Sequence, residues 1–221
     1  MPRMGVRESA VALRSDDADE VADVFQSFMR SLGHPVEVHY EVDPATSRLT
    51  GDDVLVAPSK DGWVYLRPHH VVPPDALAVE MTKRLGTLAS AIMIYEDVLW
   101  THHLVDRGTE LDRHVNLPGY FGPGEYDDSW IGDPDLVAGA VGVERAEIAP
   151  YFQQVSVRRA RSRLRAAPRA HRDDAHDLVD GWVVTELWRR MGIHWPGATD
   201  TLVRVPLGSE GTEALSAWAR S

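Results

Sequence analysis

The chain has 221 residues, of which 43% are hydrophobic and 26% are charged, and its formal net charge at pH 7 is −11. These values are ordinary for a globular protein that buries a sizeable core. Because the chain contains no cysteine, a disulfide framework, a thiolate zinc site and a cysteine nucleophile are excluded. The negative net charge argues against nucleic-acid binding, because contacts between basic side chains and phosphate dominate that affinity.

The start of the chain and its hydropathy give no sign of a membrane protein. The opening stretch, MPRMGVRESAVALRSDD, combines a short apolar run with several charges, which is not typical of a signal peptide. No stretch approaches the ~18 consecutive apolar residues that a membrane-spanning helix needs. We therefore expect a cytoplasmic protein without a membrane partner.

The first half of the chain predicts short strands that alternate with two amphipathic helices. The first helix follows an N-cap at residues 15–17, carries apolar residues at i, i+3 and i+4 spacing, and ends at Gly33. The second helix spans about residues 75–85 and ends at Gly86. Strands are expected at residues 9–13, 35–42, 54–57, 63–67 and 91–95.

A hairpin follows, with strands over residues 98–105 and 109–115 around an Asp-Arg-Gly turn. Alternating strands and helices favour an α+β fold with both helices on one face of an antiparallel sheet. The expected topology is a ferredoxin-like β-α-β-β-α-β core over residues 1–117, to which the hairpin is an addition. Residues 118–221 are expected to form a mainly helical region that packs on this core as part of one unit.

Two helix starts are expected in this C-terminal region. Asp133, which precedes a proline, predicts the N-cap of a short helix. The acidic pair at residues 173–174 predicts the cap of a second helix, whose broad apolar stripe is closed by Gly192. The residues after Pro196 are expected to be a loosely attached tail.

Burial indicates the register of the hairpin. The pairs expected across a two-residue or four-residue turn are Val105 with Glu110, His103 with Asp112, and Thr101 with His114. The other face then carries Trp100, Leu104 and Leu111, and we expect it to face the core. A register shifted by one residue would mix these apolar side chains with the carboxylates.

The polar face of the hairpin is the candidate catalytic site. Opposed residues of an antiparallel pair have Cβ atoms about 4.5–5.5 Å apart, so His103 and Asp112 are expected to form a hydrogen bond. A carboxylate that orients an imidazole and raises its pKa is the minimal acid–base couple. We assign His103 and Asp112 as that couple, assisted by Glu110 and His114, and expect no cofactor. Such a couple suits proton transfer at carbon, as in an isomerase, dehydratase or cyclase.

Four further residues are candidates for contact with the substrate. Two adjacent histidines directly follow a predicted strand, and the expected sheet would bring them near the hairpin. The other two lie on the hairpin or just after it. The four candidates are His69, His70, Thr101 and Tyr120. His102, beside Trp100 and Leu104, is instead expected to be a hydrogen-bonded residue of the core.

Other interpretations of these features stay open. Two histidines and two carboxylates can hold a divalent metal, although positions on paired strands do not by themselves converge on one point. The same residue types are also common on the solvent-facing side of a sheet. Residues 158–172, with seven arginines and no acid, suit a phosphate or an acidic partner, or a solvated segment that balances the acidic body.

Several motifs lie in or after the hairpin. They are VDRGTELDR at 105–113, PGYFG at 118–122, GDP at 132–134, IAPY at 148–151 and WRRMGI at 188–193. These motifs, spread over roughly residues 60–195, resemble a widespread group of bacterial proteins without an assigned activity. Typical members show an Asp-Gly turn, a hydrophobic-Asp-Arg step and then Pro-x-Tyr-Phe. The chain departs from the group at His103 and at His114, where an aromatic residue is usual.

Two functions of different classes follow from these patterns. The first is a small-molecule-handling protein of bacterial specialised metabolism, with a pocket on the polar face of the sheet that the C-terminal half partly covers. The alternative is a non-catalytic immunity or resistance factor, or another partner-binding protein. The edge strands of an open sheet are compatible with a homodimer.

Overall fold

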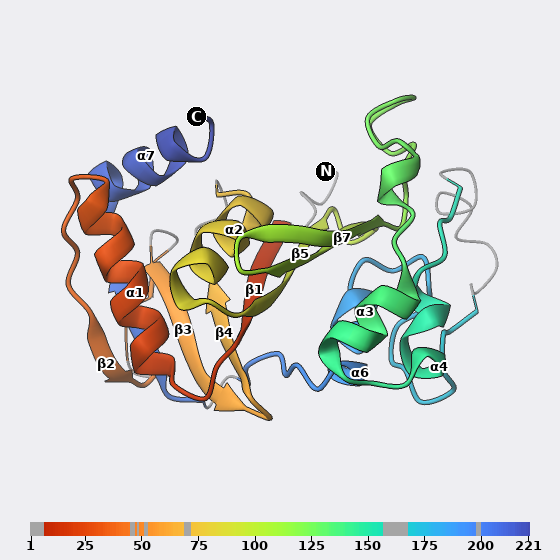
Figure 1. The fold of residues 1–221 in the computed structure, drawn as a ribbon, viewed down its shortest axis with the longest axis horizontal. Coiled ribbons are helices and arrows are strands. Elements are labelled where there is room, and N and C mark those ends of the chain that lie inside the picture. Colours follow the sequence, from red (N-terminus) through yellow and green to blue (C-terminus); the bar gives the residue numbers. More distant parts are fainter. Residues whose placement is uncertain are drawn as a thin grey trace. The chain divides into compact units, whose positions relative to one another are not determined.

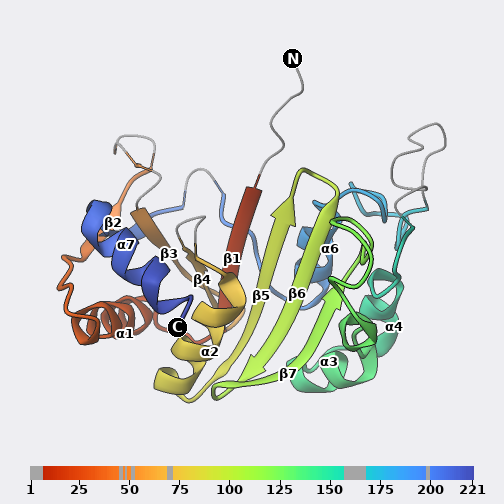
Figure 2. The same cartoon turned by 90° about the horizontal axis from the view of Figure 1, so that it is seen from above.

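The computed structural model describes residues 7–44, 47, 49–50, 53–68, 72–156, 168–197 and 200–221. Its strands form one eight-stranded sheet in the order β2-β8-β3-β4-β1-β5-β6-β7 (Figure 1, Figure 2). The strands are β1 (Arg7–Arg14), β2 (His39–Val42), β3 (Asp53–Lys60), β4 (Trp63–Arg67), β5 (Leu88–Tyr95), β6 (Leu99–Asp106), β7 (Thr109–Val115) and β8 (Leu202–Pro206). The pairs β1–β4, β2–β8, β3–β4 and β3–β8 are antiparallel.

Helices and short 3-10 turns connect the strands. The helices are α1 (Ala18–Ser31), α2 (Pro74–Leu85), α3 (Pro134–Val141), α4 (Arg145–Ile148), α6 (Val183–Arg190) and α7 (Gly208–Trp218). The 3-10 turns are η1 (Asp128–Trp130) and η2 (Ala149–Tyr151). Within the described residues, none of the helices combines the length and the apolar character needed to cross a membrane.

The chain divides into two compact units. The N-terminal unit consists of Ser9–Ala91, Val105–Thr109 and His194–Ser221. The hairpin unit consists of Ile92–Leu104 and Glu110–Ile193, together with the start of β1. The two units alternate along the sequence, so each is assembled from segments that are distant in the chain.

Local sequence signals account for the two long helices of the N-terminal unit. The carboxylate of Asp17 accepts the N–H groups of Asp19 and Glu20, which caps the start of α1. Gly33, with φ of 85°, provides the left-handed residue just after α1. Gly86, with φ of 67°, ends α2 in the same way. Both helices predicted from the sequence are therefore confirmed.

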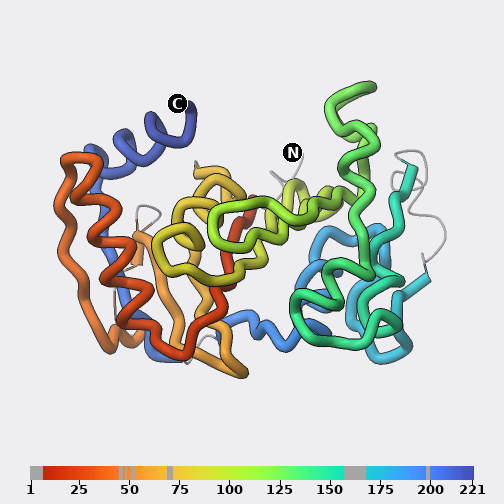
Figure 3. Tube along the Cα trace, in the orientation of Figure 1, coloured from red at the N-terminus to blue at the C-terminus, as the bar shows by residue number. Residues whose placement is uncertain are grey.

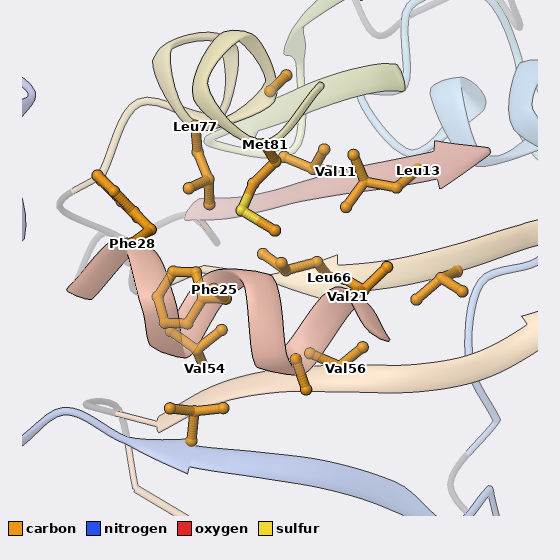
Figure 4. Packing of buried hydrophobic residues seen from close by; sticks show 14 of the residues in the cluster. Val11, Leu13, Val21, Phe25, Phe28, Val54, Val56, Leu66, Leu77 and Met81 are labelled. Atoms are coloured by element: carbon orange, nitrogen blue, oxygen red, sulfur yellow. The ribbon is translucent and has the colours of Figure 1, made fainter. Parts of the chain in front are cut away.

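The core of the N-terminal unit lies between its strands and these two helices (Figure 4). Phe25 and Phe28 come from α1, and Leu77 and Met81 come from α2. All four side chains are buried. Residues that line the core from the strands include Val11, Leu13, Val54, Val56, Val64 and Leu66. Both helices thus cover one face of the sheet, as the sequence predicted.

The C-terminal segment is a structural part of the N-terminal unit. Strand β8 pairs with both β2 and β3, and Val205 and Leu215 are fully buried in the core. Trp218 of α7 packs against Phe28 of α1 with ring centroids 4.9 Å apart, and Figure 3 traces the last residues of the chain, in dark blue, to the C-terminus. The prediction of a loosely attached tail is therefore wrong. The alternating pattern of β8 is only five residues long, too short to stand out from a loop.

The α+β class is correct, but the ferredoxin-like core with an added hairpin is wrong. The sheet contains eight strands, and β8 comes from the far end of the chain to lie between β2 and β3. Strand β2 is shorter than predicted, since it begins at His39. Strands β2 and β8, about 160 residues apart in the sequence, therefore lie side by side at one edge of the sheet. Local sequence patterns do not predict the pairing of strands so far apart.

The hairpin unit contains most of β6, most of β7 and the segment that follows them. Its apolar cluster is formed by Leu99, Val115, Leu117 and Val155, with partly buried aromatic residues around it. The side chain of Asp133 accepts the N–H groups of Asp135 and Leu136 at the start of α3. The predicted N-cap at Asp133 is confirmed.

The last helix of the hairpin unit begins later than expected. Helix α6 starts at Val183, about ten residues after the predicted cap. The carboxylate of Asp174 is buried and accepts hydrogen bonds from Tyr151, His171, Arg189 and Arg190. An aspartate used in this way is not free to cap a helix, which is why the prediction was wrong.

Candidate functional site

The candidate site is built on the hairpin of β6 and β7. Two residues, Arg107 and Gly108, separate the strands, and their φ angles are 48° and 82°. Two consecutive left-handed residues are typical of a type I′ turn, whose twist matches that of the flanking strands. Of the two turn lengths that the sequence left open, the structure has the two-residue turn.

The strand pairing slips by one residue farther from the turn. The turn places Leu99 opposite Asn116, yet the N–H of Asn116 bonds to the carbonyl of Trp100 at 3.2 Å. The ring of His114 lies 4.9 Å from that of Trp100, although the unshifted register puts the two on opposite faces. One extra residue in β7, as in a β-bulge, accounts for both observations. The predicted separation of His114 from the apolar face is wrong.

His103 forms its hydrogen bond with Glu110. The Nδ1 atom of His103 lies 2.7 Å from Oε2 of Glu110, whereas the sequence predicted a bond with Asp112. Glu110 is a diagonal neighbour of His103 in the hairpin, and its longer side chain spans that diagonal. The His103 side chain is 6% exposed and that of Glu110 is 35% exposed. The hydrogen bond with His103 lowers the pKa of Glu110.

The carboxylate of Asp112 forms its hydrogen bond with the backbone of a later segment. Its Oδ1 atom accepts the backbone N–H of Asp133 at 2.7 Å, so it holds the start of α3 against β7. Its Oδ2 atom is buried and has no hydrogen-bond partner within the described residues. Burial is the main reason that the pKa of Asp112 rises from 3.8 to about 6. At neutral pH this carboxyl therefore keeps a protonated fraction that an ordinary aspartate lacks.

Two further histidines are fully buried beside this pair. The Nδ1 atom of His114 lies 2.6 Å from the carbonyl oxygen of Ile131, so Nδ1 carries the proton and donates it. The Nε2 atom of His114 is then a buried acceptor without a partner in the described part of the chain. Burial lowers the pKa of His114 to about 4 and that of His102 to about 3. Both imidazoles are therefore neutral at pH 7, and the predicted burial of His102 is confirmed.

The structure brings only some of the predicted substrate-contact residues to the candidate site. Thr101 is buried on β6 next to the histidines. Tyr120 contacts a different set of residues, because its hydroxyl donates to Glu96 and its ring packs against Tyr95 and Phe121. His69 and His70 lie outside the described residues, as does most of the arginine run.

Two aromatic residues of the site were missed by sequence reasoning. The ring of Trp130 lies 5.1 Å from that of His103, edge to face, and the guanidinium of Arg113 lies 5.0 Å from the same indole. Phe152 lies 5.1 Å from His114 and 6.1 Å from His102. Both residues follow the hairpin at distances of 15 residues or more, so only the fold brings them to it.

The close approach of Gly132 to the site gives a first prediction. This residue has φ of +77°, and a Cβ atom there would lie 2.7 Å from a Phe152 ring carbon and 3.0 Å from the His114 Cβ. We expect Gly132→Ala to lower the free energy of unfolding by about 2–3 kcal/mol, from left-handed strain and overpacking together. Urea denaturation measures this loss.

Gly139 provides the matched control for that substitution. It lies inside α3, has an ordinary helical backbone, and would place a Cβ atom in open space. Gly139→Ala is expected to leave stability unchanged or raise it by up to about 1 kcal/mol, since alanine is the better helix former. Equal losses in the two variants would show that the contacts around Gly132 are not as described.

The metal interpretation gains no geometric support. Within the described ranges, no group of three or more His, Asp or Glu side chains is arranged to hold an ion. The site instead combines a His–Glu pair, a carboxyl with a raised pKa and two neutral imidazoles. These are groups that hold and transfer protons.

Comparison with known proteins gives no assignment. No protein-family model, no curated protein and no solved structure matches this chain. The resemblance to a bacterial group therefore stays a prediction, and the function is proposed from the geometry of the hairpin unit.

Proposed function

We propose that the hairpin unit handles a small organic molecule and that His103 moves a proton to or from a carbon atom of it. The observation that carries this proposal is the 2.7 Å contact between Nδ1 of His103 and Oε2 of Glu110. A carboxylate in this position fixes the tautomer of the imidazole, which directs the basic Nε2 atom away from Glu110. The reaction class that fits is an isomerisation, dehydration or cyclisation without a cofactor.

The roles of the two carboxyl groups follow from their environments. Glu110 has a lowered pKa because of its hydrogen bond with His103, so it stays ionised and stabilises the imidazolium that forms during proton transfer. Asp112 has a pKa raised to about 6, which suits a group that returns a proton. Environments that separate the pKa values of two nearby carboxyls are a recurrent basis for acid and base roles.

Solvent exchange tests this proposal without knowledge of the substrate. An enzyme that removes a proton from carbon in D₂O places a deuteron on carbon when the step reverses or when the product is reprotonated there, so its substrate or product gains one mass unit. We expect the protein, incubated in D₂O with a metabolite extract of its source cells, to label at least one compound. His103→Ala should slow that labelling by about 100-fold or more, the scale of a general base. Glu110→Gln should slow it by about 10-fold or more, because the neutral amide no longer stabilises the imidazolium. Mass spectrometry follows the label.

The matched control for these variants is His39→Ala. His39 is exposed on β2 of the N-terminal unit, and its nearest carboxylate is 3.9 Å away. Labelling at the native rate by His39→Ala and loss of labelling by His103→Ala would support the proposal. If no compound gains a label, or if His103→Ala labels as fast as the native protein, the catalytic role is wrong and a non-catalytic binding protein is the better description.

A further inference from the structure

The N-terminal unit contains a cavity that the proposed function does not use. Its volume is 250 Å³, and it is formed by the ends of β3 and β4 together with residues 194–197. Its lining residues include Lys60, Trp63, Tyr65, Trp195 and Asp200. This space is large enough for a molecule of about ten to fifteen heavy atoms, somewhat below the usual size of a ligand pocket.

Three aromatic side chains line the cavity. The rings of Tyr65 and Trp195 meet edge to face with centroids 5.3 Å apart. Trp63 is 3% exposed, and the guanidinium of Arg14 lies 5.0 Å from its ring. A wall of three large aromatic rings favours a flat, apolar guest, since such rings pair best with other rings.

The polar groups at the cavity include carboxylates, an indole N–H and a lysine. The carboxylate of Asp200 accepts the N–H of Gly197 at 2.8 Å. Beside the cavity, the carboxylate of Asp61 lies 2.6 Å from Nε2 of His194, which lines it. In the part of the chain that the structure describes, the buried Nε1 of Trp63 has no hydrogen-bond partner, and the cation Lys60 lies exposed at the rim of the cavity. Buried polar groups are normally satisfied by protein, water or a ligand.

We propose that this cavity binds a small planar aromatic carboxylate. The ring of the guest packs against Trp63, Tyr65 and Trp195, and its carboxylate accepts hydrogen bonds from the ammonium of Lys60 and the indole N–H of Trp63. Charge-assisted hydrogen bonds of this kind are stronger than neutral ones. All of these residues belong to the N-terminal unit, so the inference stands independently of the proposed chemistry at His103.

Fluorine NMR with a defined probe tests the cavity. The probe is 4-(trifluoromethyl)benzoate, and its uncharged amide serves as the matched ligand. We expect the native protein to broaden or shift the fluorine signal of the carboxylate at probe concentrations below about 1 mM, within the affinity range of small ligands. The amide should bind at least about 10-fold more weakly.

Variants locate the bound probe. Lys60→Gln should weaken binding by about 10-fold, whereas Lys83→Gln, which changes the only other lysine of the chain, should bind as the native protein does. Trp63→Phe should weaken binding similarly, with Trp218→Phe as its control. Because Lys60 is exposed at the rim, its substitution tests the proposal even if Trp63→Phe fails to fold. No binding by the native protein, or unchanged binding by Lys60→Gln, would overturn it.

Discussion

Replacing Asp174 by alanine is expected to lower the free energy of unfolding of the hairpin unit by about 3–5 kcal/mol, the usual cost of breaking a buried charge network on one side. The side chain of Asp174 is fully buried. Its two oxygens accept from the Tyr151 hydroxyl at 2.9 and 3.0 Å and from the N–H of His171 at 2.9 Å. They also lie 3.2 and 3.3 Å from Arg189 and Arg190.

Several groups lose their partner together in this variant. Burial and the Asp174 carboxylate raise the pKa of Tyr151, so its hydroxyl is a buried donor that needs an acceptor. Arg190 is only 15% exposed and would retain a charge with less compensation. The hydrogen bonds of Asp174 also connect the segment before α6 with η2 and with the end of α6, over 23 and 15 residues of sequence. Removing the carboxylate should therefore weaken the contacts among these three segments.

The neighbouring residue gives an unusually close control. Asp173 pairs with the same two arginines, but its side chain is 62% exposed. Solvent screens exposed ion pairs, so they contribute little to stability, and Asp173→Ala should have little effect. Urea denaturation of the two variants, followed by a signal from the hairpin unit, separates the expectations. Similar losses for Asp173→Ala and Asp174→Ala would mean that the buried network is not what stabilises this region.

The same aspartate shows why part of the fold was not predictable. An acidic pair ahead of an apolar stripe normally caps a helix, and the sequence was interpreted in that way. The partners that occupy Asp174 lie on η2 and at the end of α6. Local pattern therefore gave the helix α6 and its end but placed its start about ten residues too early.

The hairpin shows the same limit at the candidate site. The position of the turn was predictable because Gly108 adopts a positive φ without strain, although two turn lengths stayed open. The hydrogen-bond partner of His103 was not predictable from the sequence. The long side chain of Glu110 reaches His103 from a diagonal position on the neighbouring strand, while Asp112 accepts the backbone N–H of Asp133. The sequence identified the four site residues as neighbours, whereas their pairing required contacts with residues 130–152.

Acidification from pH 7 to pH 5 is expected to lower the stability of the protein by about 2.5 kcal/mol through three buried groups. His102 and His114 have pKa values of about 3 and about 4 in the folded chain, against about 6.5 when unfolded. Their folded pKa values are lowered, so the unfolded state binds more protons below pH 6.5. Below pH 6.5, each histidine then lowers the free energy of unfolding by about 1.4 kcal/mol per pH unit, which amounts to about 2 kcal/mol at pH 5.

Asp112 acts in the opposite direction. Its folded pKa is raised to about 6 from 3.8, so its contribution is favourable at low pH and is lost as the pH rises from about 4 to about 6. Acidification from pH 7 to pH 5 therefore returns about 1.3 kcal/mol. The two histidines outweigh the one carboxyl, which fixes the sign of the net effect. The loss develops mainly between pH 6.5 and pH 4.

Substitutions within the site separate these contributions. His114→Phe keeps an aromatic ring beside Trp100 and Phe152 but cannot bind a proton, so its loss between pH 7 and pH 5 should be smaller by about 2 kcal/mol. Asp112→Asn should enlarge the loss by about 1.3 kcal/mol for the opposite reason. His39→Ala, at an exposed histidine, should leave it unchanged. Urea midpoints at the two pH values provide the measurement, and a native pH response in His114→Phe would show that this histidine is not the buried neutral base that gives the hairpin its acid sensitivity.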